Sequence, residues 1–225
     1  MFTSKSLEIK NFYSKNPFPG LYTMEDIQRY QGQNRYLSFI SNYLHNKSSV
    51  LDAGCGSGFI SNYFAYNNKN TKFTSVDFSD ALDHSRKISQ QLNLKNIIYH
   101  KEDLCNWKNK QKFDVVLCQG VLHHIPDYKT ALENLKSFLK PNGIFLIGLY
   151  HPWSKWLQKI LPKSYNNKVL EIDQEKNPFE LSFTKTQVIN MFQKYKFIKS
   201  YPSYYFNYKN GGLVIYIFRK ENTYD

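Results

Sequence analysis

The sequence predicts an α/β protein, a doubly wound three-layer αβα sandwich, and three observations support this. Between residues 46 and 149, strand-like apolar runs alternate with helical ones, and repeated β–α units imply parallel strands with right-handed crossovers. A glycine-rich turn, VLDAGCGSGFI at residues 50–60, follows the first strand-like run. Near the end, KNGG separates two further strand-like runs, which is typical of an antiparallel hairpin. A mostly parallel sheet closed by an antiparallel edge is therefore expected.

Each element is predicted from its periodicity and its boundary residues. Ser79 is the N-cap candidate of the second helix of the alternating region, and PNG at 141–143 is expected to stop the third. The expected strands are 49–54, 72–78, 96–103, 113–121, 144–150, 198–208 and 212–220, and the expected helices are 57–67, 79–93, 127–140 and 184–197.

The length and composition indicate one folded domain. The chain has 225 residues, of which 41% are hydrophobic and 17% aromatic, so it can bury a single sizeable core. No apolar run approaches the roughly 20 residues of a membrane span, and the N-terminus lacks a signal-peptide pattern. A soluble, cytoplasmic protein is expected.

The alternating region does not account for the whole chain, which we divide into four segments of a single domain. Ligands of open α/β sheets bind beyond the carboxyl ends of the strands, so an insertion after the fifth strand is positioned to act as a lid. The segments are an N-terminal helical cap at 1–45, a core at 46–149, a lid insertion at 150–183, and a closing helix and hairpin at 184–225.

The expected lid carries an apolar helical face surrounded by lysines. We expect this face to cover the sheet edge and the pocket, with a groove for an apolar substrate or a membrane-surface contact as alternatives. The face comprises Trp153, Trp156, Leu157, Ile160 and Leu161.

The net charge of +12 raises the question of an anionic partner such as RNA. Only four of the 30 basic residues are arginine, which is the favoured side chain for phosphate and base contacts, and the chain has only four alanines. This profile is typical of the codon bias of an AT-rich genome. Codon bias and an anionic partner both remain open explanations.

The three cysteines are Cys55, Cys105 and Cys118. Their number is odd and no pair has CxxC spacing, which argues against a disulfide framework and against a zinc site. We expect reduced thiols packed as small apolar groups, and no metal.

The glycine-rich turn is not a phosphate loop. No Gly-Lys-Ser/Thr follows it, and Phe59 stands where the dinucleotide fingerprint would have its third glycine. The glycines are Gly54, Gly56 and Gly58, and the acid before them, Asp52, is unfavourable for a phosphate. This arrangement favours a ligand with a positively charged end.

Further polar residues follow the later strands of the alternating region. Asp77 ends the second strand, where a carboxylate can accept hydrogen bonds from both ribose hydroxyls, and Phe78 could pack on a purine. Asp103 and Leu104 follow the third strand and could meet the other edge of an adenine. Gln119 ends the fourth strand beside the glycine turn. The ligand so described is an adenosine joined to a short cationic group.

Five motifs in order, VLDAGCGSG, SVDFS, KEDL, FDVVLCQGVLHHIPD and LKPNGIFLI, resemble the class I S-adenosylmethionine-dependent methyltransferases over residues 48–149. The resemblance implies a Rossmann-like sheet of seven strands with an antiparallel last strand, S-adenosylmethionine as cofactor and S-adenosylhomocysteine as product. It implies that the glycine turn holds the methionine part, Asp77 the ribose, and Asp103 and Leu104 the adenine, with Gln119 near the sulfonium. The implied cofactor-binding residues are Asp52, Ala53, Gly54, Cys55, Gly56, Asp77, Phe78, Asp103, Leu104 and Gln119.

The catalytic candidates are His123 and His124 after the fourth strand and His151 after the fifth. Each could act as a general base or orient a substrate, and each could instead serve packing. Positioning and a desolvated site can promote methyl transfer without a dedicated base. In related methyltransferases an N-terminal helix closes over the donor, which adds Tyr13, Tyr22 and Arg35 as weaker candidates.

Three functions are compatible with these features. The first is methyl transfer to an oxygen, nitrogen or carbon nucleophile of a small molecule. The second is methylation of RNA, such as tRNA, or of protein; the charge favours it, but residues 118–121 lack the Asn/Asp-Pro-Pro-Tyr/Phe motif of base N-methylation and no cysteine follows a proline. The third is a non-catalytic module that binds the methyl donor. The oligomeric state stays open.

Overall fold

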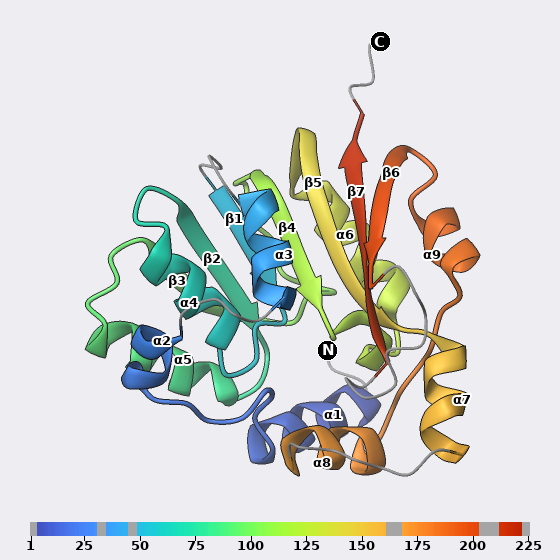
Figure 1. Ribbon diagram of the computed structural model, residues 1–225, viewed down its shortest axis with the longest axis horizontal. Coiled ribbons are helices and arrows are strands. Elements are labelled where there is room, and N and C mark those ends of the chain that lie inside the picture. Colours follow the sequence, from blue (N-terminus) through green and yellow to red (C-terminus); the bar gives the residue numbers. More distant parts are fainter. Residues whose placement is uncertain (1–3, 31–34, 45–48, 161–167, 203–211, 222–225) are drawn as a thin grey trace.

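The protein is described by a computed structural model that covers the chain apart from residues 1–3, 31–34, 45–48, 161–167, 203–211 and 222–225. Seven strands form one sheet in the order β3-β2-β1-β4-β5-β7-β6 (Figure 1). Strand β7 runs antiparallel to both of its neighbours, and every other pair is parallel. This confirms the predicted fold. The strands are β1 (Ser49–Ala53), β2 (Lys72–Asp77), β3 (Ile97–Lys101), β4 (Phe113–Gln119), β5 (Leu139–Tyr150), β6 (Tyr195–Tyr201) and β7 (Leu213–Lys220).

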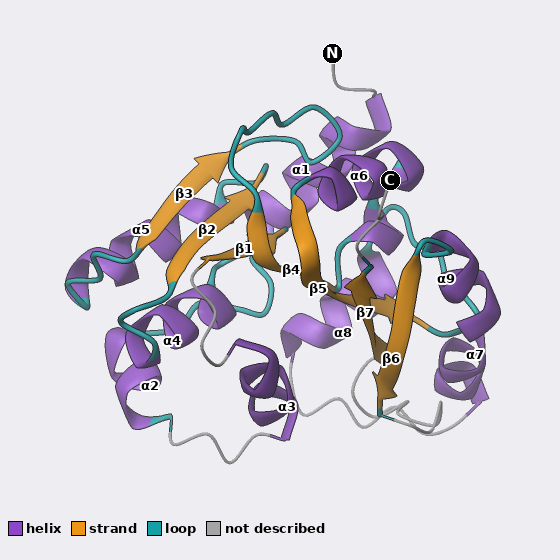
Figure 2. Ribbon diagram, turned by 90° about the horizontal axis from the view of Figure 1, so that it is seen from above, coloured by secondary structure: helices purple, strands orange, loops and turns teal. Residues whose placement is uncertain are grey.

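Helices cover both faces of this sheet. Figure 2 shows α3 and α4 on one side of the sheet and α6 on the other. The helices are α1 (Ser4–Lys15), α2 (Met24–Arg29), α3 (Arg35–Leu44), α4 (Phe59–Asn67), α5 (Ala81–Gln91), α6 (Tyr128–Ser137), α7 (Pro152–Ile160), α8 (Lys168–Lys176) and α9 (Lys185–Met191), with a short 3₁₀ turn, η1 (Leu122–His124).

The central strands lie between two apolar layers. All five residues of β1 are buried, as expected for a strand covered on both faces. On one face, Leu132 and Leu135 of α6 and Val188 of α9 belong to the same core cluster as alternate residues of β4 and β5. On the other, Leu37 and Ile40 of α3 pack in a second cluster with α4. Helix α3 thus contributes to one of the two core layers.

Helices α1 and α8 lie together beyond the carboxyl ends of the parallel strands, at the bottom of Figure 1. The Tyr13 hydroxyl of α1 donates a hydrogen bond of 2.8 Å to Asp173 of α8. Segments 160 positions apart in the sequence therefore meet at the edge of the sheet where open α/β folds bind ligands. The division of the chain into cap, core, lid and closing segment stays a prediction.

The PNG segment does not stop a helix as expected. Helix α6 ends at Ser137, and β5 begins at Leu139, before PNG. Phe113 of β4 pairs with Leu139 while Val115 pairs with Ile144, so the four residues 140–143 stand opposite the single residue Asp114 and form an irregularity within the strand. Pairing with β4 on both sides of this segment makes it part of a strand. The prediction of a helix for residues 138–140 was therefore wrong.

The closing helix is shorter than predicted. It begins as expected, with Thr184 and Gln187 forming reciprocal capping hydrogen bonds. It ends at Met191, and Tyr195 already starts β6, where it pairs with Lys220 of β7. Tertiary pairing with β7 overrides the helical pattern of residues 192–197. The predicted KNGG turn lies mostly outside the described residues.

Ser79 is not the N-cap of α5. Its hydroxyl donates a 2.6 Å hydrogen bond to Asp77, and the helix begins at Ala81 after Asp80. Ser79 instead helps to orient the carboxylate at the end of β2. Strands β3 and β4 are also shorter than predicted and end at Lys101 and Gln119.

The apolar face of α7 does not cover the pocket. Trp153 is 59% exposed, and Trp156 and Ile160 are also exposed, so the predicted covering role was wrong for these residues. The two tryptophan rings contact each other edge to face at 5.6 Å. Leu161 lies outside the described residues. Within the part of the chain that the structure describes, no helix is both long and apolar enough to cross a membrane.

Candidate active site

A cavity of about 550 Å³ lies at the carboxyl ends of the parallel strands. It opens where the strand order reverses, between β1 and β4, which is the usual ligand position in open α/β sheets. The loops after β1, β2, β3 and β4 all contribute to its wall. Of the residues predicted from the sequence to bind a cofactor, all but Ala53 line it: Asp52, Gly54, Cys55, Gly56, Asp77, Phe78, Asp103, Leu104 and Gln119.

The glycine turn after β1 is held in place by Asp77 and by the segment after α1. The backbone N–H of Gly56 donates a 2.8 Å hydrogen bond to Oδ2 of Asp77. The N–H and hydroxyl of Ser57 both donate to the carbonyl of Phe18, at 3.0 and 3.1 Å. The Ser57 hydroxyl also lies 2.7 Å from the carbonyl of Gly20. The N-terminal segment thus forms one wall of the turn, a contact that the sequence did not reveal.

Asp77 is a buried carboxylate, 8% exposed. Its Oδ1 accepts from the N–H and the hydroxyl of Ser79, and its Oδ2 accepts from Gly56. Burial raises the pKa of Asp77, and these hydrogen bonds oppose the rise. A carboxylate has about four lone-pair sites, so Asp77 retains capacity for a further donor.

Asp52 at the end of β1 is buried more deeply, at 3% exposed. It accepts a hydrogen bond from the Ser61 hydroxyl, which in turn accepts from Ser75 at 2.8 Å. Burial raises the pKa of Asp52 to about 6, with a smaller contribution from the charge of Asp77. The described ion pairs include no lysine or arginine partner for either carboxylate.

Asp103, after β3, and Gln119, at the end of β4, line the cavity and also form hydrogen bonds with neighbouring parts of the protein. Asp103 accepts from the N–H of Cys105 at 2.9 Å and so caps the turn that follows β3. The Gln119 amide donates to the carbonyl of Leu146 at 2.8 Å. Its Oε1 accepts from the Tyr36 hydroxyl of α3 at 3.4 Å. The amide plane of Gln119 is therefore fixed across β4 and β5.

The three candidate histidines have different surroundings. His124 lines the cavity. His123 is fully buried, does not line the cavity, and packs against Tyr150 with ring centroids 3.9 Å apart. His151 is 4% exposed, does not line the cavity either, and accepts from the N–H of Trp153 at 3.3 Å. Burial lowers the pKa of all three.

Of the weaker candidates, Tyr13 and Tyr22 line the cavity. The Tyr22 hydroxyl accepts from Asn62 at 2.8 Å. The side chain of Arg35 lies outside the described residues. All three cysteines are free, and burial is the main cause that raises the pKa of each thiol, so none is prepared as a nucleophile.

The sequence reasoning missed several residues of the cavity, and two of them form a hydrogen-bonded pair. Tyr150 at the end of β5 and Asp173 in α8 both line it, and the Tyr150 hydroxyl donates to Asp173 at 2.9 Å. Both lie within the region assigned as a lid. No motif marks Asp173, because its position depends on how α8 folds back over the strand ends.

The charges that line the cavity are of one sign. Within the described chain, no lysine or arginine lines it, although the protein as a whole carries a net charge of +12. The lysines and arginines whose placement is described thus all lie away from the cavity wall. The charged residues of the wall are Asp52, Asp77, Glu102, Asp103, Asp127 and Asp173.

Comparison with known families identifies the chain. The family model described as "Methyltransferase domain" matches residues 44–198, which is most of the sequence and includes every strand from β1 to β5. The protein belongs to this methyltransferase family. Its glycine turn and strand-end acids therefore occupy the cavity of a methyltransferase domain.

Among curated relatives of this chain, the ubiquinone biosynthesis O-methyltransferase of Coxiella burnetii (strain Dugway 5J108-111) is 32% identical over 119 residues, 52% of this chain and 50% of that one. The protein of the same name from Pasteurella multocida (strain Pm70) is 31% identical over 147 residues, 60% of each chain. The chain spans only about half the length of most of the curated relatives it matches.

Solved structures share the fold of this chain over nearly its full length. The N-methyltransferase NodS from Bradyrhizobium japonicum WM9, in complex with S-adenosyl-L-homocysteine, has a TM-score of 0.64 at 12% identity and covers 98% of this chain and 100% of its own. The 1,6-didemethyltoxoflavin-N1-methyltransferase of Burkholderia thailandensis, with bound 1,6-didemethyltoxoflavin and S-adenosylhomocysteine, has a TM-score of 0.64 at 19% identity and covers 97% and 87%. At these identities the likeness concerns the fold.

Proposed function

We propose that the protein is an S-adenosylmethionine-dependent methyltransferase that transfers a methyl group to an oxygen, nitrogen or carbon nucleophile of a small molecule. The observation that carries this proposal is the acid-lined cavity at the switch point of a methyltransferase-type sheet. Relatives named as O-methyltransferases and neighbours that hold S-adenosylhomocysteine support the donor. We place the protein in the cytoplasm.

The residues present fit this cofactor. Asp52 and Asp77 are buried carboxylates without a lysine or arginine partner among the described ion pairs, and a donor with a sulfonium and an ammonium group would supply the missing positive charge. The turn needs glycine at position 54, because its φ is 78° and a Cβ there would lie 2.4 Å from the Val121 side chain.

Each part of the donor has a residue to hold it. Asp52 and the turn from Ala53 to Gly56 would hold the methionine part, with Ala53 contributing backbone only because its side chain is buried. Asp77 would accept from the ribose hydroxyls, and Phe78, Asp103 and Leu104 would surround the adenine. Gln119 would orient groups near the sulfonium. When bound, the cofactor supplies an electrophilic methyl group on a positively charged sulfur.

Calorimetry of the full chain should detect micromolar binding of S-adenosylmethionine or S-adenosylhomocysteine and no binding of NAD. Phe59 occupies the position of the third fingerprint glycine, and the acidic cavity wall repels a pyrophosphate. Tight NAD binding with no response to S-adenosylmethionine would refute the proposed function. Transfer of a labelled methyl group to a small-molecule extract would separate an enzyme from a non-catalytic donor-binding module.

Donor affinity should also depend on pH through Asp52. With its pKa raised to about 6, Asp52 is about one-tenth ionised at pH 5 and nine-tenths at pH 7, so binding should strengthen about 10-fold over this interval if the carboxylate form binds the cationic donor. The stability of the ligand-free fold should change with pH in the opposite direction. The folded state holds this proton more tightly than the unfolded state, so ligand-free stability should fall as pH rises from about 4 to 6.

Calorimetric titrations at pH 5, 6 and 7 measure this dependence, and Asp52→Asn provides the comparison. The variant should lose the part of the pH dependence that Asp52 causes and keep the part due to Asp77, whose pKa is raised in the same direction. A variant that keeps the full 10-fold rise would show that another group is responsible.

RNA or protein methylation is the second candidate function, and the net charge of +12 is the observation that favours it. Binding of tRNA should then weaken steeply with salt concentration. The acidic wall of the cavity favours the small-molecule function over this one, because a phosphate backbone would have to approach carboxylates.

A further inference from the structure

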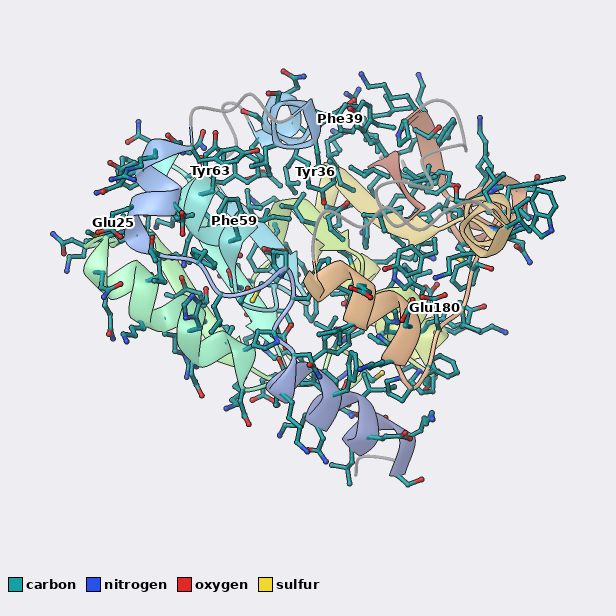
Figure 3. The ribbon with its side chains drawn as sticks, turned by 60° about the horizontal axis from the view of Figure 1, so that its bottom comes forward. Glu25, Tyr36, Phe39, Phe59, Tyr63 and Glu180 are labelled. Carbon is teal, nitrogen blue, oxygen red and sulfur yellow. The ribbon has the colours of Figure 1, made fainter. Side chains whose placement is uncertain are left out.

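Four polar side chains from distant parts of the chain converge at one end of the cavity. Tyr13 comes from α1, His124 from η1, Tyr150 from β5 and Asp173 from α8, and all four line the cavity. Figure 3 brings the bottom of the molecule forward and shows α1 and α8 in front of the strand ends. Asp173 accepts from Tyr13 at 2.8 Å and from Tyr150 at 2.9 Å, and is 4% exposed. Asn177 donates a further hydrogen bond to it at 3.1 Å.

His124 presents an unpartnered nitrogen beside this carboxylate. Its Nδ1 lies 2.9 Å from the carbonyl of Phe179, and because a carbonyl only accepts, the proton belongs on Nδ1. Nε2 is then a bare lone pair. It is buried, has no hydrogen-bond partner among the described residues, and lies 4.0 Å from Oδ2 of Asp173. Burial keeps the pKa of His124 below its ordinary value, so the ring is neutral at pH 7.

We propose that His124 and Asp173 form the acceptor subsite, which takes an uncharged or cationic small molecule through an O–H or N–H group bound at Nε2 of His124. This inference rests on the proposed methyltransferase function. An unpartnered buried acceptor atom is costly unless a ligand donor satisfies it. The charge of the acceptor is inferred from the cavity wall, which carries six carboxylates and no lysine or arginine within the described chain. An anionic acceptor would be repelled there.

The subsite accounts for the proton of the reaction. The acceptor's oxygen or nitrogen forms its bond to the methyl carbon with a lone pair, while the sulfur–methyl bond breaks and its electron pair stays on sulfur. The proton of the O–H or N–H group passes to Nε2 of His124. The resulting imidazolium is stabilised by the negative charge of Asp173 at 4.0 Å. The proton then leaves to solvent, and His124 returns to its neutral form.

Asp173 acts in this scheme as a positioning residue. Burial and the neighbouring charge of Asp173 raise the pKa of Tyr13 well above its ordinary value, so its phenol stays protonated and donates to the carboxylate. The donors Tyr13, Tyr150 and Asn177 hold the carboxylate beside His124. Helix α8 thereby supplies the carboxylate that completes the subsite beyond the strand ends.

Nitrogen NMR of the imidazole rings in the full chain tests the pair without turnover. His124 should be the Nδ1–H tautomer with a pKa below 6.5. Asp173 and Glu180 raise this pKa, whereas burial and Lys155 lower it, so Asp173→Asn should lower it further by about 1. The charge-matched control Asp83→Asn, on the exposed side of α5, should leave it unchanged. An Nε2–H tautomer, or no response to Asp173→Asn, would contradict the proposal.

The wild-type protein loaded with S-adenosylhomocysteine tests the acceptor class, even if Asp173→Asn does not fold. Tyramine and 4-hydroxyphenylpropionate are phenols of similar size with opposite side-chain charges. Tyramine should shift the Nε2 resonance of His124 and bind about 10-fold more tightly than the anionic phenol, as expected for repulsion of about 1.4 kcal/mol. The reverse order, or no shift by either phenol, overturns the inference. Failure of S-adenosylhomocysteine to bind at all would instead refute the proposed function.

Discussion

Replacement of Asp77 by asparagine is expected to weaken S-adenosylmethionine binding by about 100-fold, or about 2.8 kcal/mol. The carboxylate would lose charge-assisted hydrogen bonds to the ribose hydroxyls. It would also lose part of its hold on the glycine turn, because an amide NH₂ group would face either the N–H of Gly56 or the donors of Ser79, all of which now donate to Asp77.

Isothermal titration calorimetry measures this loss, and thermal unfolding of the same samples checks that the fold is intact. Asp83→Asn on the surface of α5 removes the same charge away from the cavity and should bind the donor like the wild type. Wild-type affinity in a folded Asp77→Asn protein would remove Asp77 from the cofactor site and weaken the assignment of the glycine turn with it.

Replacement of Gly56 by alanine is expected to destabilise the protein by about 3 kcal/mol, from about 1 kcal/mol of backbone strain and about 2 kcal/mol of steric overlap. Gly56 has a φ of 55°, and a Cβ there would lie 2.3 Å from the carbonyl oxygen of Phe18. That oxygen cannot withdraw freely, since the N–H and the hydroxyl of Ser57 both donate to it. The substitution should therefore displace the N-terminal segment from the turn.

Gly120 provides the matched control. Its φ of 75° is also left-handed, but a Cβ there would meet no described atom within 4 Å. Gly120→Ala should cost only the backbone strain, about 1 kcal/mol. Urea unfolding of both variants separates strain from overlap, and equal destabilisation would show that the close contact with Phe18 is not maintained in solution.

Much of the sheet could be predicted because its signals are local. The alternation of apolar strand runs with amphipathic helices places β1 to β5 in order, and the glycine turn and Asp77 stand at strand ends where ligands bind. Two of the errors lie where a segment with a helical pattern pairs instead with a neighbouring strand. Pairing with β4 draws residues 139–140 into β5, and pairing with β7 draws residues 195–197 into β6, against their helical pattern.

The acceptor side of the cavity could not be predicted in the same way. Asp173 carries no motif, and the three histidines were equivalent candidates until their surroundings were known. Their surroundings separate His123, whose ring packs against Tyr150 at an interplanar angle of 31°, from His124, which faces Asp173 in the cavity wall. Likewise, the net charge of +12 did not reveal that the cavity wall is acidic.

The sequence by itself determined the fold class, and it placed the residues proposed to hold the donor at the ends of strands that the hydrophobic pattern reveals along the chain. The tertiary structure alone decided the acceptor side of the cavity. There α1 and α8 meet over the strand ends, where Tyr13 binds Asp173, a residue 160 positions away in the sequence. This contact depends on the packing of the whole chain and on no local pattern.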